Sequence, residues 1–235
     1  MKANNVDFID RPDLELRKLP KTHSIYTHPF LLSARDQNLP VRAVKNFALQ
    51  ELFISLAFPT MMAEVVARIP FEREDLKHPI IENMFEEVGC KNPEKSHPNL
   101  LRNLARQLGA TESEIFDQEP TPETQESLER LLAQCRSDYM EALTSIGYGN
   151  EYWLLIEYPP MKQACAKHGV LPEVLKFFDV NTEADVIHTE NVEKVMFSSP
   201  ITQQQFARLK QVLSESLDAR SVFYNGICRI SDLPY

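Results

Sequence analysis

The chain has 235 residues, of which 43% are hydrophobic and 25% are charged, and its formal net charge is −9. This length and apolar content suffice for a sizeable core, and long helical patterns with only six glycines favour a single domain. The acidic balance and the lack of a Lys/Arg cluster argue against nucleic acid as a partner, because that function needs a basic face.

Targeting signals and paired cysteines are not apparent in the sequence. No stretch approaches the about 20 apolar residues that a membrane-spanning helix needs, and the polar N-terminus lacks the apolar segment of a signal peptide. The cysteines are widely spaced and form no C-x-x-C pair: Cys90, Cys135, Cys165 and Cys228. We therefore expect a cytoplasmic protein with reduced cysteines and no membrane partner.

The N-terminal half predicts helices separated by proline and glycine. Residues 1–24 are polar and are expected to form an N-terminal arm, and a short helix follows from His28. Apolar residues recur every three or four positions over 41–68, which predicts a long helix. Another is expected over 74–88, where Gly89 provides a C-terminal cap. The next begins at His97 and ends at Gly109.

The C-terminal half predicts further helices. Residues 110–122 are expected to form a loop, and a helix capped by Thr121 should run to about residue 146. The Gly-Tyr-Gly sequence at 147–149 should break it, and helices should follow over 150–168, from Pro172 and from Pro200 to about residue 228. Because no segment shows sustained period-two alternation, we predict an all-α protein with one helical domain over 25–235.

The most informative residues lie in the helix that follows Pro172. Asn181, Asp185 and His188 stand at i, i+4 and i+7 and therefore share one helix face. Carboxylate and imidazole groups are good ligands for divalent metals. An isolated D-x-x-H pair is more often an acid–imidazole pair on a solvated helix surface, so this motif acquires weight only from other donors.

Two further donors flank the loop after Gly89. Glu87 lies near the negative end of its helix dipole, a poor place for an unpaired carboxylate, whereas the adjacent Glu86 should point elsewhere. His97 is expected at a helix N-cap, a position that Ser96 would fill better. The positive helix end there should keep the imidazole neutral, which is the metal-binding form.

Glu151 is the fifth candidate, after the predicted glycine break. It could equally be a first-turn acid that complements the helix dipole, and Glu157 is a rival ligand. Together these segments offer carboxylates and imidazoles from separate helices. Such donor sets inside helical bundles are typical of non-haem iron proteins.

The arrangement resembles the haem-oxygenase-like, CADD-like non-haem iron oxidases and oxygenases, which are relatives of the TenA and PqqC proteins. The resemblance covers roughly residues 25–225, and the matching segments are His28-Pro-Phe-Leu31, Asn83-Met-Phe-Glu-Glu-Val-Gly89, Ser96-His97-Pro-Asn-Leu-Leu, Leu108-Gly109, Glu151 and Phe177-Phe178-x-x-Asn181-x-x-x-Asp185-x-x-His188. The family implies a seven-helix bundle.

The resemblance also implies a site for one or two iron(II) ions. The implied ligands are Glu87, His97, Glu151, Asp185 and His188. Asn181 stands where the family usually has histidine, and an amide oxygen is a much weaker ligand, so the site is either mononuclear or has a loosely held second iron. Glu64 is a further candidate carboxylate.

The activity implied by the resemblance is oxidation of a small molecule with dioxygen as co-substrate. Family members act on amino-acid-like or fatty-acid-like substrates by C–C cleavage, decarboxylation or N-oxygenation. Aromatic residues that could line a substrate pocket, or could equally be ordinary core residues, are Tyr148, Tyr152, Trp153, Phe58 and Phe85.

Two other functions stay open. A metal-free, TenA-like hydrolase would need a nucleophilic cysteine near an acid, and no cysteine here has that sequence context. A CADD-like protein-interaction module would need a large exposed apolar patch. Whether the chain forms a homodimer is also open.

Overall fold

The computed structural model describes residues 8–234. Within them, regular structure is helical apart from one isolated bridge between Phe8 and Thr202, which confirms the all-α prediction. The elements in chain order are α1 (Pro12–Thr22), η1 (Ser24–Thr27), α2 (Pro29–Arg35), α3 (Val41–Arg68), α4 (Glu74–Glu87), η2 (Pro93–Lys95), α5 (His97–Gln107), α6 (Glu112–Phe116), α7 (Pro122–Cys135), α8 (Tyr139–Thr144), η3 (Ser145–Glu151), α9 (Tyr152–Lys167), α10 (Pro172–Met196) and α11 (Gln203–Ser231).

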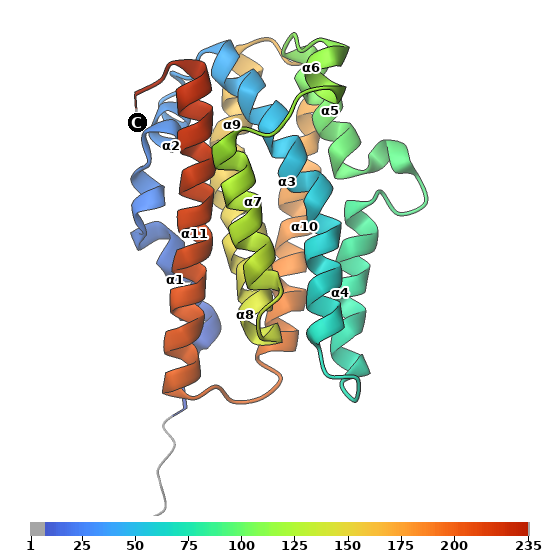
Figure 1. Cartoon of the computed structure of the whole chain (residues 1–235), viewed down its shortest axis with the longest axis vertical. Coiled ribbons are helices and arrows are strands. Elements are labelled where there is room, and N and C mark those ends of the chain that lie inside the picture. Colours follow the sequence, from blue (N-terminus) through green and yellow to red (C-terminus); the bar gives the residue numbers. More distant parts are fainter. Residues whose placement is uncertain (1–7, 235) are drawn as a thin grey trace, which may run out of the picture.

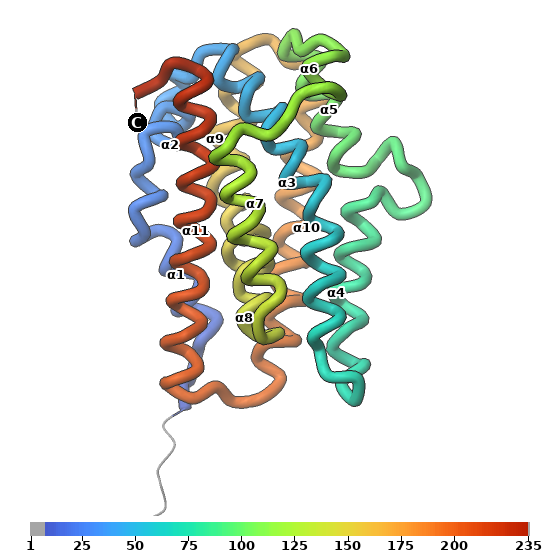
Figure 2. The backbone as a smooth tube through the Cα atoms, in the orientation of Figure 1, coloured from blue at the N-terminus to red at the C-terminus, as the bar shows by residue number. Residues whose placement is uncertain are grey.

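The long helices run side by side along the long axis of the molecule (Figure 1). Helix α3 packs against α4, α5, α7 and α11, while α10 packs against α4, α5 and α9. In the backbone trace, α4 and α5 lie at the edge of the bundle opposite α11 (Figure 2). Helices α3 and α10 thus both contact α4, α5 and α9, so residues that are distant in sequence face one another among these five helices.

Helix α3 corrects the expectation that no segment is long and apolar enough to cross a membrane. By length and composition alone this helix is long and apolar enough to cross a membrane, but half of its most apolar stretch is buried inside the bundle. Gln50 and Glu51, in the middle of the helix, are also buried. These features are those of the core helix of a bundle.

Two segments expected to lack helix contain one. In the expected N-terminal arm, α1 buries Leu16 and Arg17 forms an ion pair with Glu193 of α10; residues 1–7 lie outside the described part. In the expected loop over 110–122, Thr111 and Glu114 cap α6 reciprocally and Ile115 is buried. Both helices are short and mostly polar, so their apolar periodicity is weak in the sequence.

The Gly-Tyr-Gly segment does not break the helix as expected. It lies within a π-helical turn, η3, which continues directly into α9. A Cβ atom at Gly147 would lie 2.5 Å from a methyl carbon of Val192, and one at Gly149 would lie 2.5 Å from Cβ of Ser216. Glycine is therefore needed here because α10 and α11 approach closely, and π-helical turns are frequent at functional sites.

Candidate metal centre

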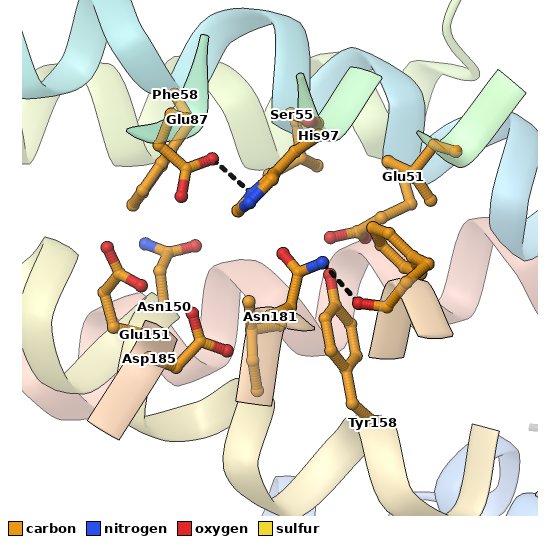
Figure 3. Close-up of a pocket in the computed structure, with 14 residues that line it drawn as sticks. Glu51, Ser55, Phe58, Glu87, His97, Asn150, Glu151, Tyr158, Asn181 and Asp185 are labelled. Atoms are coloured by element: carbon orange, nitrogen blue, oxygen red, sulfur yellow. Dashed lines mark hydrogen bonds and ion pairs between the residues drawn. The ribbon is translucent and has the colours of Figure 1, made fainter. Parts of the chain in front are cut away.

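Five side chains expected as ligands converge inside the bundle, and Figure 3 shows four of them: Glu87, His97, Glu151 and Asp185. Glu87 is the last residue of α4, His97 the first of α5 and Glu151 the last of η3, while α10 carries Asp185 and His188 one turn apart. None of the five is more than 8% exposed. The structure thus brings together donors that span about a hundred positions of the chain.

The Glu87 carboxylate lies between the two imidazoles. Its Oε2 is 2.6 Å from Nδ1 of His97, and its Oε1 is 4.0 Å from Nδ1 of His188. Nδ1 of His188 is also 3.3 Å from Oε2 of Glu151. Donor atoms of Glu87, Glu151 and His188 all lie within 4.8 Å of one another, so a single ion could contact all three.

Two buried oxygens at this place have no hydrogen-bond partner when both carboxyl groups are ionised: Oε1 of Glu151 and Oδ2 of Asp185. Burial, together with the negative charge of Glu151, raises the pKa of Asp185 well above its ordinary value. Burial also opposes ionisation of Glu151, but His188 outweighs it and lowers the pKa of Glu151. Unpaired buried oxygens are costly, so this donor set fits a divalent cation.

Neighbouring carboxylates, and not the helix dipole, control the protonation of the two imidazoles. Burial lowers the pKa of His97, but the Glu87 carboxylate outweighs burial and raises it. This is contrary to the neutral imidazole expected at a helix start. For His188, burial is likewise outweighed, chiefly by Glu151, and its pKa rises to about 9. A bound cation would compete with these protons for the same nitrogen atoms.

Glu86 also contacts the site, which corrects the expectation that it points elsewhere and that Glu87 alone serves as a ligand. Its Oε2 lies 2.9 Å from Nε2 of His188. The side chain is half exposed and reaches the imidazole from the rim. When Nε2 donates to Glu86, Nδ1 is left facing Glu87 and Glu151, which is the usual way in which a carboxylate orients a metal-binding histidine.

The two further candidate ligands differ in position. Asn181 lines the cavity and its Nδ2 donates to the Phe177 carbonyl at 2.6 Å, which leaves the amide oxygen facing the cavity (Figure 3). Glu64 is not among the residues that line the cavity. It pairs with Arg68 at 2.7 Å and with Arg136 at 2.9 Å, because it lies on an outer face of α3.

All of the donors except His188 line a small cavity between α3 and α5 on one side and α9 and α10 on the other (Figure 3). Its volume is about 30 Å³, enough for a water molecule or two, so a larger molecule enters only if lining side chains move. The residues that line it are Glu51, Ile54, Ser55, Phe58, Glu87, His97, Leu101, Asn150, Glu151, Leu154, Tyr158, Phe177, Asn181 and Asp185.

Of the expected pocket aromatics, Phe58 lines this cavity. Tyr148 does not: it is fully buried elsewhere, with its hydroxyl donating to Glu193. Tyr152 packs near Tyr148 and Arg17, and Trp153 donates to the hydroxyl of Tyr224. Phe85 is exposed on α4. The sequence did not indicate Glu51, Ser55 or Tyr158, because buried polar residues within apolar helices have no periodic signal of their own.

Similar proteins extend over most of the chain. A 4-aminobenzoate synthase of Nitrosomonas europaea is 22% identical over 220 residues, which are 88% of this chain and 87% of that protein. A Shewanella denitrificans domain of unknown function with a haem-oxygenase-like fold superposes with a TM-score of 0.78 at 18% identity, covering 95% of this chain and 94% of that one. A CADD-like protein of unknown function from Nostoc punctiforme has a TM-score of 0.77 at 15% identity, covering 93% and 96%.

These structural neighbours confirm the haem-oxygenase-like fold. A sequence model of a protein family described as iron-containing redox enzymes matches residues 45–219. That stretch contains all five candidate ligands as well as the cavity residues of α3, α9 and α10. The chain belongs to this family of iron-containing redox enzymes.

Proposed function

We propose that this protein is a non-haem iron oxidase or oxygenase that uses dioxygen to oxidise a small molecule. The observation that supports the proposal most strongly is the buried convergence of three carboxylates and two imidazoles, with two carboxylate oxygens left unpaired. Iron(II) held by carboxylate and histidine ligands keeps positions open for dioxygen, and this is the chemistry it would supply here.

The roles of the side chains follow from their places. Glu87, His97, Glu151, Asp185 and His188 would hold iron, and Glu86 would orient His188. The apolar lining from Phe58, Leu154 and Phe177 would exclude water from reactive species. Asn181 would contribute at most a weak oxygen ligand, so we propose one firmly held iron and a labile second one.

The substrate class is part of the proposal. The similarity to a 4-aminobenzoate synthase and the carboxylates that line the cavity favour a small, amino-acid-like substrate over a fatty-acid-like one. A long alkyl chain would leave cavity-lining polar groups such as the Ser55 hydroxyl without partners, which is costly.

Anaerobic titration with iron(II) tests the proposal. We expect tight uptake of at least one iron per chain and, on exposure to oxygen, a visible absorption transient with oxygen consumption. His188→Ala should lose the tightly bound iron, whereas the matched substitution His78→Ala, at an exposed position on α4, should not. Failure of the unsubstituted protein to bind iron or to consume oxygen would overturn the proposed function.

The metal-free hydrolase has little structural support. It requires a cysteine nucleophile beside the cavity, and no cysteine is among the lining residues. Cys135, Cys165 and Cys228 are buried elsewhere as free thiols, and Cys90 is exposed on the loop after α4.

One observation supports a protein-interaction role: apolar side chains are exposed on two neighbouring helices. Exposed apolar side chains occur on α4 and just after it, and on the neighbouring α10: Ile81, Phe85, Val88, Val180, Val186 and Ile187. Exposed apolar groups of this kind occur at protein interfaces. Homodimer formation stays a prediction; sedimentation of the protein beside a Phe85→Asp, Ile187→Asp variant would test whether this face associates.

A further inference from the structure

A second buried carboxylate, Glu51, faces the cavity from α3. It is 3% exposed, and its Oε2 contacts the guanidinium of Arg220. Ser55 lies one helical turn further along the same face, and its hydroxyl has no hydrogen-bond partner. Figure 3 shows both side chains on the α3 wall, with Tyr158 pointing into the cavity from α9 on the other side. None of these groups belongs to the proposed iron ligands.

Glu51 shares one buried guanidinium with a second acid. Arg220 of α11 is buried and lies 2.7 Å from Oε2 of Glu51 and 2.6 Å from Oε2 of Glu157. One guanidinium therefore faces two buried carboxyl groups. Burial raises the pKa of both acids, so one of them keeps a proton where an exposed carboxyl group would lose it.

Of Glu51, Glu157 and Arg220, only Glu51 lines the cavity. Glu157 and Arg220 are not among the lining residues and lie behind it, against Tyr224 and Phe223. A molecule in the cavity can therefore replace the charge of that proton only at Glu51. A singly charged group with N–H donors would do so and would also give the Ser55 hydroxyl a hydrogen-bond partner.

We propose that Glu51, assisted by Ser55 and Tyr158, forms a subsite for the protonated amino group of the substrate. The inference rests on the proposed function for the chemistry at the other end of the cavity, where Glu87, Glu151 and Asp185 lie (Figure 3). A substrate carboxylate would be repelled by the negative charge of Glu51. A divalent metal ion would find a single carboxylate at this end, with the Arg220 guanidinium in contact with it.

The subsite is tested with simple four-carbon probes and three proteins. n-Butylamine, 1-butanol and butanoate are titrated calorimetrically into the unsubstituted protein, Glu51→Gln and Glu64→Gln, each metal-free and each loaded with iron(II) without oxygen. Glu64→Gln is the matched control, because Glu64 lies on the same helix away from the cavity. The iron content of each sample is measured separately.

The expected result is that the unsubstituted protein and Glu64→Gln bind the amine more tightly than the alcohol. Glu51→Gln should weaken amine binding at least about tenfold, as for a lost hydrogen bond to a charged group, without weakening alcohol binding. A general loss of structure would weaken both probes, so the selective loss is diagnostic.

Two outcomes would overturn the subsite. One is an unsubstituted protein that binds the amine no better than the alcohol; the other is Glu51→Gln binding the amine as the unsubstituted protein does. If iron uptake and oxygen consumption are normal in those cases, only the subsite fails. If the amine preference is found but iron is not bound, the proposed function fails while the subsite stands.

Discussion

Replacing Glu157 by glutamine should change how the stability of the metal-free protein depends on pH. Glu157 is fully buried and accepts a 2.6 Å hydrogen bond from Arg220. Burial, reinforced by the charge of Glu51 and opposed by Arg220, raises its pKa from 4.5 to about 7. Between these values the unfolded chain releases the proton while the folded protein keeps it. The free energy of unfolding must therefore fall as the pH rises through this interval.

The size of the effect follows from the interval. At about 1.4 kcal/mol per pH unit, the span from 4.5 to about 7 corresponds to about 3 kcal/mol. Glutamine keeps the shape and the acceptor for Arg220 but cannot lose a proton. We therefore expect the unsubstituted protein to lose up to about 3 kcal/mol more than Glu157→Gln between pH 5 and pH 8.

Urea unfolding of both proteins, followed by circular dichroism after removal of metal with a chelator, measures this difference directly. Other titrating groups such as His188 contribute to both proteins and largely cancel when the two pH dependences are subtracted. Equal pH dependence in the two proteins would refute the reasoning, because it would mean that Glu157 is ionised in the fold with an ordinary affinity for protons.

Two further outcomes are expected. Gly147→Ala should cost about 1–3 kcal/mol in urea unfolding, because the new methyl group would lie 2.5 Å from Val192, and Val192→Ala in the same chain should restore part of it; additive losses would contradict the close contact. Glu86→Gln should lower iron(II) affinity about tenfold in competition with a chelator while stability changes little. Unaltered affinity would show that His188 needs no orienting partner.

The long helices were predictable because their boundaries depend on local chemistry. Pro172 at a first turn, Gly89 in a left-handed cap with φ of 83° and Thr121 as an N-cap act within a few residues and can be identified in the sequence. The spacing of Asp185 and His188 likewise depends on helical periodicity alone, and the resemblance added their partners on other helices.

The remaining features depend on contacts that the sequence does not express. Glu86 was set aside because adjacent helical residues point about 100° apart, yet a long flexible side chain at a helix end still reaches His188. Glu51 lies in a strongly apolar helix, where the sequence alone suggests an isolated surface residue. Its burial depends on the ion pair with Arg220 of α11, which is distant in sequence. The glycines at 147 and 149 suggested a break in the helix. Their actual role, to let α10 and α11 approach closely, depends on tertiary packing that the sequence does not show.

The π-helical turn over Ser145–Glu151 gives this bundle an unusual tolerance at one place in the chain. A π turn accommodates one residue more than an α turn, so deleting a single residue between 145 and 150 would let the segment relax into a regular α-helix. Because the extra residue is taken up within the turn, Glu151 and the helix after it would keep their faces, with the carboxylate still beside His188. One codon lost within the turn would thus leave this carboxylate in the interior of the bundle, whereas one codon lost after Glu151 would rotate the residues that follow by roughly 100° about the helix axis.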